Sequence, residues 1–207
     1  MTQKKKFDSK ALQFKSLKKE SLYQGFFQLN RYTFKNQLFE GGWSEVFQRE
    51  IFERGHAAAA LLLDRENEML VLVEQFRPGA TETEVQPWLI EPVAGIIEPG
   101  ETPEDVVRRE ALEEAGCQIK RLHKICEYLV SPGGTTERIW LYLGEVDCQN
   151  LPELAGLDHE HEDILIHQIP VKQGFEMLNN GQFNNGMTLI AMQWLALNWA
   201  KIDEIWR

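Results

Sequence analysis

Three glutamates crowd a short stretch in the middle of the chain: Glu110, Glu113 and Glu114. In an α-helix, residues three and four apart lie on the same face, so these carboxylates would share one narrow arc. Like charges at this spacing destabilise a helix by about 0.2–0.5 kcal/mol per pair, so a cation should compensate them. Mg²⁺ and Mn²⁺ prefer oxygen ligands and suit such a face. The pattern predicts a divalent-metal site, and the plainest alternative is a solvated acidic face.

The residues around these glutamates mark both ends of the expected helix. Thr102 supplies a hydroxyl N-cap, Pro103 suits the first helical position, and Gly116 supplies the stop. Glu104 and Asp105 fall in the first turn, where the helix dipole favours anions. A stripe of small apolar side chains would let the helix lie close against a sheet: Val107, Ala111 and Ala115. The carboxylate face should then look outward.

A loop at residues 95–100 should lead into this helix. Gly95 and Gly100 allow tight turns and a close approach of main-chain carbonyls to a metal ion or a phosphate. Glu101 stands at the junction of loop and helix. Its carboxylate would be near enough to brace Arg109 or a ligand carboxylate.

Composition restricts the partners and the compartment. The 207 residues carry a formal net charge of −10, which argues against nonspecific binding to nucleic acid or to acidic membranes. Cys117, Cys126 and Cys148 lack CxxC spacing, so neither a disulfide framework nor a zinc site is indicated. No segment approaches the ~18 consecutive apolar residues of a membrane span, and no apolar segment follows Lys4 to Lys6. We therefore expect a cytoplasmic protein that binds neither nucleic acid nor membrane.

The N-terminal quarter differs from the rest. Residues 1 to about 20 mix charge with a few apolar side chains, and we expect them to be poorly ordered. Residues 26–38 and 46–52 have the pattern of half-exposed strands, and the glycine pair at 41–42 marks a hairpin turn between them. A lone hairpin is marginally stable. We therefore expect residues 1–53 to form a small β element that builds a dimer.

The main domain should span residues 54–207. Apolar runs predict strands at 57–63, 69–76 and 88–93 before the central helix, with a polar loop at 78–87. After that helix we expect strands at 124–129, 139–146 and 164–169, then helices at 171–178 and 187–201. Elements in this order indicate an α/β fold with a mixed sheet and helices on both faces, an α/β/α sandwich.

Two loops are candidates to complete the metal site. Residues 131–137 offer a hydroxyl, amides and a carboxylate, and they are either an ordinary connection or a contact to phosphate or ribose. Residues 147–163 are acidic, and a solvated charge run is the usual explanation. A base is nevertheless needed, because three metal-bound glutamates cannot also deprotonate water freely. We expect His159 and His161 to be exposed neighbours of that base, not metal ligands.

These groups define a class of reaction. A diphosphate resists attack because its negative oxygens repel a nucleophile, so catalysis needs cations on those oxygens and a positioned water. A carboxylate helix holding two or three Mg²⁺ ions would supply both. The residues by themselves indicate metal-dependent hydrolysis of a phosphoanhydride. They do not specify the two groups that the phosphoanhydride joins.

The central stretch also resembles the signature of the Nudix hydrolases. The matching positions are Gly95, Glu101, Arg109, Glu110, Glu113, Glu114 and Gly116, with Ala111 and Cys117 in the apolar slots. Other segments are similar to bacterial ADP-ribose pyrophosphatases: residues 49–56, 74–77, 88–95, 131–134 and 160–163. The resemblance implies a Nudix-type α/β/α sandwich that hydrolyses ADP-ribose to AMP and ribose 5-phosphate. It also implies a homodimer whose N-terminal strands help to build the partner's site.

The resemblance further implies roles for individual residues. Mg²⁺, with Mn²⁺ as a substitute, would be held by Glu110, Glu114 and the carbonyl of Ala94. Glu113 and Arg109 would assist them. Glu160 or Glu162 would be the loop base, with Glu160 favoured and the other approaching a metal ion.

Substrate contacts follow from the same resemblance. Arg77 and either Phe26 or Phe27 would flank the adenine through cation–π and stacking contacts. The remaining contacts, to phosphate or to the terminal ribose, would come from Arg49, Ser131, Gly133 and Glu137.

Two alternatives stay open. Another nucleoside diphosphate sugar, such as GDP-mannose, would undergo the same anhydride chemistry, because substrate choice lies in the binding loops. The second alternative is a nucleotide-binding regulatory module without turnover. Such a module has no chemical need for Glu110, Glu113 and Glu114 together, so the intact set argues against it.

Overall fold

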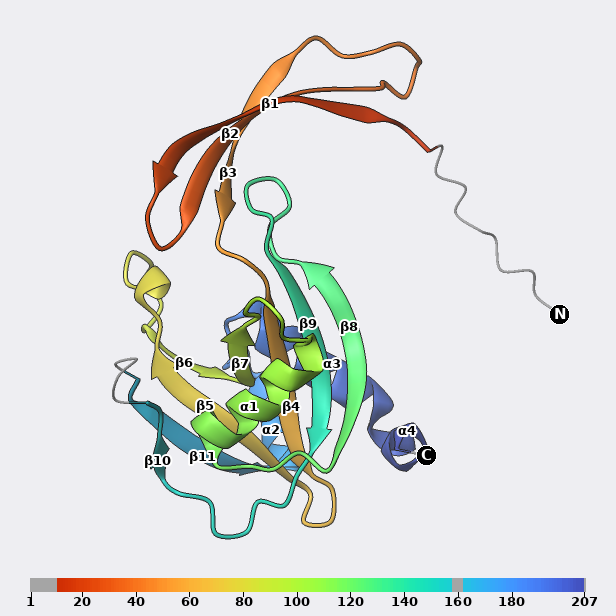
Figure 1. Cartoon of the computed structure of the whole chain (residues 1–207). Coiled ribbons are helices and arrows are strands. Elements are labelled where there is room, and N and C mark those ends of the chain that lie inside the picture. Colours follow the sequence, from red (N-terminus) through yellow and green to blue (C-terminus); the bar gives the residue numbers. More distant parts are fainter. Residues whose placement is uncertain (1–10, 158–161, 207) are drawn as a thin grey trace, which may run out of the picture. The chain divides into compact units, whose positions relative to one another are not determined.

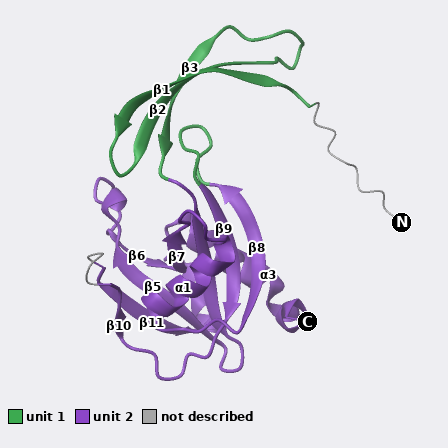
Figure 2. Cartoon of the chain, viewed as in Figure 1, with its two compact units in different colours: residues 1–54, 130–137 green, residues 55–129, 138–207 purple. Residues whose placement is uncertain are grey.

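The computed structural model describes residues 11–157 and 162–206, and the chain divides into two compact units (Figure 2). Unit 1 comprises residues 1–54 and 130–137, and unit 2 comprises residues 55–129 and 138–207. The segment 130–137 thus belongs to the same unit as the N-terminal strands, although it lies between two strands of unit 2.

Unit 1 is a three-stranded antiparallel sheet (Figure 1). Its strands, in spatial order, are β1 (Phe14–Gln24), β2 (Gln28–Asn36) and β3 (Phe47–Glu53). The hairpin expected from the glycine pair is confirmed as β2 and β3. The expectation of poor order was wrong for residues 14–20, because β1 is held by main-chain pairing with β2, which does not require buried side chains.

Main-chain hydrogen bonds attach segment 130–137 to this sheet. The amide of Phe52 donates to the carbonyl of Gly134 at 2.8 Å, and the amide of Thr136 donates to the carbonyl of Phe52 at 3.3 Å. The end of β3 therefore fixes the loop that the sequence singled out for its hydroxyl and amides.

Unit 2 contains a mixed eight-stranded sheet. Its strands are β4 (Ala57–Asp64), β5 (Met69–Phe76), β6 (Trp88–Glu91), β7 (Val93–Ile96), β8 (Arg121–Leu129), β9 (Arg138–Glu145), β10 (Leu154–Ala155) and β11 (Ile164–Pro170). The main order is β10-β11-β5-β4-β9-β8, with β6 paired to β5 and β7 paired to β4. The pair β4 and β9 is parallel, while the other pairs are antiparallel, so the predicted mixed sheet is confirmed.

Helices cover both faces of this sheet. Helix α1 (Pro103–Ala115) packs on one face, and α2 (Val171–Asn179) and α3 (Gly186–Asn198) pack on the other. The helix expected to run to residue 201 ends at Asn198, and a 3-10 turn (Trp199–Lys201) and the short α4 (Ile202–Ile205) follow. No helix among the described residues is both long and apolar enough to cross a membrane.

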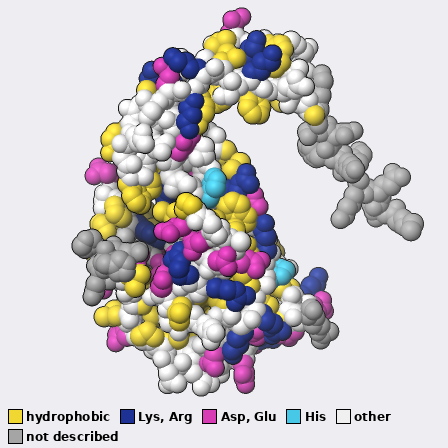
Figure 3. Space-filling model, in the orientation of Figure 1, with side chains coloured by type: hydrophobic (Ala, Val, Ile, Leu, Met, Phe, Trp, Pro, Cys, Tyr) yellow, Lys and Arg dark blue, Asp and Glu magenta, His cyan; other side chains and the backbone are white. Residues whose placement is uncertain are grey.

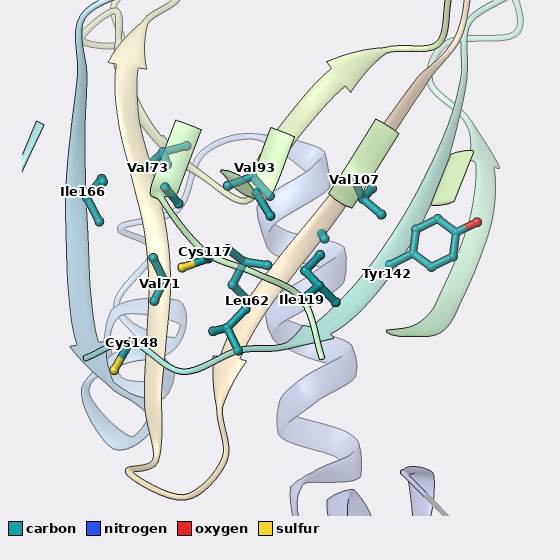
Figure 4. Packing of buried hydrophobic residues seen from close by; sticks show 14 of the residues in the cluster. Leu62, Val71, Val73, Val93, Val107, Cys117, Ile119, Tyr142, Cys148 and Ile166 are labelled. Carbon is teal, nitrogen blue, oxygen red and sulfur yellow. The ribbon is translucent and has the colours of Figure 1, made fainter. Parts of the chain in front are cut away.

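Side chains of β4 alternate between two apolar cores. Leu62 belongs to the core beneath α1, shown in Figure 4, whereas Leu61 and Leu63 belong to the core beneath α2 and α3. Successive side chains of a strand point to opposite faces, so one continuous apolar run fills both layers. This arrangement confirms the predicted α/β class with helices on both faces.

Both ends of α1 form as predicted. The Thr102 hydroxyl accepts from the amide of Asp105 at 3.2 Å, and the Asp105 carboxylate accepts from the amide of Thr102 at 2.9 Å, which is a capping box. Gly116 ends the helix with a left-handed φ of 62°, a conformation that glycine adopts without steric cost. These signals fix which residues of α1 face the sheet.

Asp64, at the end of β4, is a buried carboxylate with a structural role. Its side chain is 2% exposed and accepts hydrogen bonds from the amide and side chain of Asn67 and from the amide of Cys148, at 2.9–3.1 Å. Burial by itself would raise the pKa of Asp64, but these hydrogen bonds outweigh burial and lower the pKa to about 2. The ionised carboxylate therefore ties the β4–β5 turn to the chain after β9.

We predict that Asp64→Asn lowers the free energy of unfolding by about 2 kcal/mol at pH 7. A carboxyl group whose folded pKa lies below its unfolded value stabilises the fold above that unfolded value, and the stabilisation disappears as the pH falls towards the folded pKa. Urea denaturation at pH 7, 4 and 3 should show that the difference in unfolding free energy between wild type and Asp64→Asn shrinks as the pH approaches 3. Asp147→Asn, at a half-exposed carboxylate, is the control. A deficit independent of pH would contradict this explanation.

Candidate metal centre

The three glutamates of α1 do not all face solvent. Glu114 is 2% exposed, and the side chains of Glu110 and Glu113 are 13% and 31% exposed. The expectation of an outward carboxylate face was therefore wrong for Glu110 and Glu114, which lie against the sheet. Figure 3 shows acidic and basic side chains gathered together on the surface around α1.

Strand β7 explains how these two carboxylates reach the sheet. The amide of Ala94 donates to Glu114 Oε2 at 2.9 Å. A Cβ on Gly95 would lie 1.7 Å from Glu110 Oε1, so only glycine at this position leaves room for the Glu110 side chain. Gly95 thus lies within a strand and not in the predicted loop, and the close approach it permits is to a carboxylate.

Arg109 gathers three carboxylates on the exposed side of the centre. Its guanidinium donates to Glu101 at 3.0 Å, to Glu110 at 2.7 Å and to Glu113 at 2.9 Å. Bonds to Glu101, then to Glu113 and Glu110, raise the pKa of Arg109. Glu101 braces Arg109 as the sequence suggested, and the guanidinium offsets the like-charge repulsion among its neighbours.

The two carboxylates against the sheet hold protons more tightly than usual. Burial raises the pKa of Glu114 to about 8, although the Ala94 amide and Gln75 favour the charged form. Burial also raises the pKa of Glu110, with Glu113 and Glu162 adding to the rise and Arg109 opposing it. These shifts mean that burial makes the ionised carboxylates costly, and that the hydrogen bonds from the described partners do not fully offset this cost.

The donor chemistry fits a hard divalent cation. Within the described part of the chain, no three carboxylate, imidazole or thiol side chains converge to hold a metal ion by themselves. Mg²⁺, however, commonly takes one or two carboxylates and completes its shell with waters and substrate phosphates. Glu114 accepts from the amide of Ala94 and Glu110 packs against Gly95, so two carboxylates lie beside one short segment of strand β7.

The acidic loop is described in part. Glu162 is close enough to influence the pKa of Glu110, and its amide donates to the carbonyl of Leu157 at 3.4 Å. Glu160, the favoured base, lies outside the described residues together with His159 and His161. Its role stays a prediction.

Gln75 of strand β5 and Arg77, the residue after that strand, add two further polar side chains near the centre. Gln75 donates through Nε2 to Glu114 Oε1 at 3.1 Å. Arg77, expected beside adenine, donates through Nε to Glu91 Oε2 at 2.6 Å. Glu91 is buried, and burial raises its pKa while Arg77 lowers it.

Neither Gln75 nor Glu91 is among the site residues predicted from the sequence. Alternation is the signal that would have found Gln75, because Gln75 and Arg77 stand two residues apart at the end of an apolar strand. No such pattern marks Glu91. Their partners depend on how β5, β6 and α1 pack, which the local pattern does not specify.

The remaining predicted substrate contacts lie in unit 1. The ring centroids of Phe26 and Phe27 are 4.8 Å apart, and those of Phe27 and Phe52 are 5.3 Å apart. Both pairs pack edge to face. Arg54 lies 5.4 Å over the Phe27 ring and 3.5 Å from the Glu137 carboxylate. Arg54 was not assigned a role from sequence, although it belongs to the similar segment 49–56.

Unit 1 does not bring all of its predicted contacts together. Ser131, Gly133 and Glu137 share the loop attached to β3. Arg49 and Phe52 are three residues apart on β3, so their side chains point to opposite faces of the sheet. Arg49 instead lies 4.9 Å over the Phe47 ring and donates to the carbonyl of Gln48.

We predict that Gly95→Ala weakens Mg²⁺ binding by about 10–100-fold, because the new methyl group must displace the Glu110 carboxylate. The displaced atoms end a flexible side chain, so the melting temperature should change little. Isothermal titration with Mg²⁺ and a thermal scan measure the two effects. Gly79→Ala is the matched control, since nothing lies within 4 Å of its added Cβ. Equal affinity in Gly95→Ala and wild type would refute a ligand role for Glu110.

We also predict that the metal-free protein loses stability as the pH rises from 4.5 to about 8. Glu114 binds its proton more tightly in the folded state, so ionisation over this window favours unfolding, by an amount on the order of a few kcal/mol. Urea denaturation in EDTA should show this slope in wild type and a flatter profile in Glu114→Gln. Glu113→Gln, at a more exposed carboxylate, should keep the slope. Identical profiles for Glu114→Gln and wild type would contradict the prediction.

Comparison with known proteins identifies relatives that align with most of the chain. The profile of the NUDIX domain matches residues 53–185. An ADP-ribose pyrophosphatase of Escherichia coli (strain K12) is 45% identical over 188 residues, covering 91% of this chain and 90% of that protein. An ADP-ribose pyrophosphatase of Haemophilus influenzae is 43% identical over 194 residues, covering 92% and 89%. A GDP-mannose pyrophosphatase of Yersinia pestis is 31% identical over 191 residues, covering 91% and 94%.

A solved structure shares the fold. The crystal structure of an ADP compounds hydrolase aligns with a TM-score of 0.69 and 20% identity, covering 94% of this chain and 98% of that one. The profile match extends over more than half of the chain and includes α1 with its glutamates. The chain therefore belongs to the NUDIX domain family.

Proposed function

We propose that this protein is a hydrolase that cleaves the diphosphate of ADP-ribose to AMP and ribose 5-phosphate. The observation that carries the proposal is 45% identity to an ADP-ribose pyrophosphatase over 91% of the chain. The carboxylates packed against β7 would bind the divalent cations that such a reaction needs.

Mg²⁺ is the proposed cofactor, in two or three copies, with Mn²⁺ as a substitute. Glu110, Glu114 and the carbonyl of Ala94 would hold it, with Glu162 approaching from the acidic loop. Bound cations would neutralise the diphosphate oxygens and activate a water molecule. Buried carboxylates with raised pKa values support this assignment, because a cation would satisfy them.

The protein's own residues would position the reactants. Arg109 holds Glu113 beside Glu110, and Glu160 would accept the proton of the attacking water. In unit 1, the exposed ring of Phe26 is available to stack on a base, and the loop with Ser131, Gly133 and Glu137 offers polar groups to phosphate or ribose. Arg77 and Arg49 complete the proposed substrate contacts.

A homodimer remains part of the proposal. Unit 1 exposes large apolar side chains, which supports association with a second copy: Phe14, Leu17 and Tyr23 on β1, and Phe39 in the turn between β2 and β3. A cytoplasmic location stays a prediction from the sequence.

GDP-mannose is the second candidate substrate. The 31% identity to a GDP-mannose pyrophosphatase, over 91% of the chain, keeps it open. The identity to the ADP-ribose pyrophosphatases is higher over a similar span, which favours ADP-ribose.

We predict that the purified protein with Mg²⁺ turns over ADP-ribose faster than GDP-mannose, and that Glu114→Gln lowers kcat/KM by at least about 100-fold. The reaction is run in H₂¹⁸O, and chromatography of the products measures the rate. Mass spectrometry of the separated products then identifies the phosphorus that water attacked. Label in AMP places the attack on the adenosyl phosphate, and label in ribose 5-phosphate places it on the other phosphorus.

Three outcomes of this assay oppose parts of the proposal. Faster turnover of GDP-mannose would reassign the substrate. Absence of turnover with both compounds would favour a binding module. A Glu114→Gln variant as fast as wild type would refute the metal role of α1.

A further inference from the structure

Gln75 is an amide in an apolar setting. It is 6% exposed and follows the buried run Leu70–Val73 of β5. A buried amide without a partner costs about 1–3 kcal/mol, so its bond to Glu114 accounts for its presence there.

The Glu114 carboxylate is fixed through both of its oxygens. Gln75 donates to Oε1 at 3.1 Å, and the amide of Ala94 donates to Oε2 at 2.9 Å. The donors belong to two different strands, β5 and β7, so rotation of the carboxylate would break at least one bond. Each carboxylate oxygen has two lone pairs and keeps one for a further ligand.

The kind of donor also matters. Glu110 and Glu113 are bound by the cationic guanidinium of Arg109, whereas the hydrogen bonds that the described residues make to Glu114 come from neutral groups. A neutral donor orients a carboxylate without cancelling its charge. Arginine or lysine at position 75 would compete with a bound cation, and asparagine would be one methylene too short.

We propose that Gln75 is a positioning residue, whose amide holds the Glu114 carboxylate in the orientation that binds the divalent cation. Gln75 contacts neither substrate nor reacting atoms in this proposal and acts through Glu114 alone. The inference rests on the metal role proposed above for Glu114.

The test measures Mn²⁺ binding to the full chain without substrate, from the electron paramagnetic resonance signal of free Mn²⁺. Gln75→Met keeps the length of the side chain and removes the donor, and its Mn²⁺ affinity should fall by about 10–100-fold. Gln168→Met, the same change at an exposed position of the neighbouring strand β11, should bind as wild type does. Urea denaturation checks that each variant is folded.

A double-mutant cycle separates positioning from a general structural effect. In the Glu114→Gln background, adding Gln75→Met should cause no further loss of Mn²⁺ affinity. If Gln75→Met does not fold, Gln75→Asn takes its place. Its shorter side chain should no longer reach Glu114, so the hydrogen bond should be lost and the Mn²⁺ affinity should fall.

The outcomes separate a failure of the Gln75 role from a failure of the metal site. Wild-type affinity in Gln75→Met and Gln75→Asn, or an equal loss in the Glu114→Gln background, would overturn the role of Gln75 and leave the metal site intact. Mn²⁺ binding that does not depend on Glu114 would overturn the metal role and this inference with it. The identity of the substrate affects neither result.

Discussion

The carboxylates of Glu110 and Glu114 lie against strand β7 with most of their surface removed from water. An isolated buried carboxylate is costly, and two on adjacent turns of one helix repel each other. The described partners offset only part of the cost of burying these carboxylates, since the pKa values of both groups remain raised. A divalent cation would remove the remaining imbalance, so the same burial that strains the metal-free protein prepares a site for the cation.

Several local features maintain this arrangement. The capping box at Thr102 and the glycine stop at Gly116 set the ends of α1 and therefore the direction of each side chain. The missing Cβ of Gly95 lets Glu110 approach β7, and the β7 amide of Ala94 receives Glu114. On the exposed side, Arg109 links Glu101 to Glu110 and Glu113. The caps act within a few residues, whereas the contacts to β7 arise where α1 packs on the sheet. Together these features place carboxylates where a diphosphate would need cations.

The sequence was informative wherever the determining interactions are local. Caps and periodicity predicted α1, and apolar runs predicted β4 and β5, because these signals act within a few residues. Strand β1 was missed, because its pairing with β2 gives no burial pattern to detect. The inward orientation of Glu114 and its bond to Gln75 were also missed, since they arise where β5, β7 and α1 meet. A motif specifies which residues act, whereas packing decides how they are oriented.

Diffraction from crystals soaked in MnCl₂ tests most directly whether a divalent cation binds between α1 and β7. Anomalous scattering locates Mn²⁺ without any assumption about substrate. We predict a peak bonded to the carboxylates of Glu110 and Glu114 and to the carbonyl of Ala94, at the Mn–oxygen distances of a hard-cation site, about 2.0–2.3 Å. Peaks only elsewhere, or no peak at these residues under conditions that support turnover, would contradict the account.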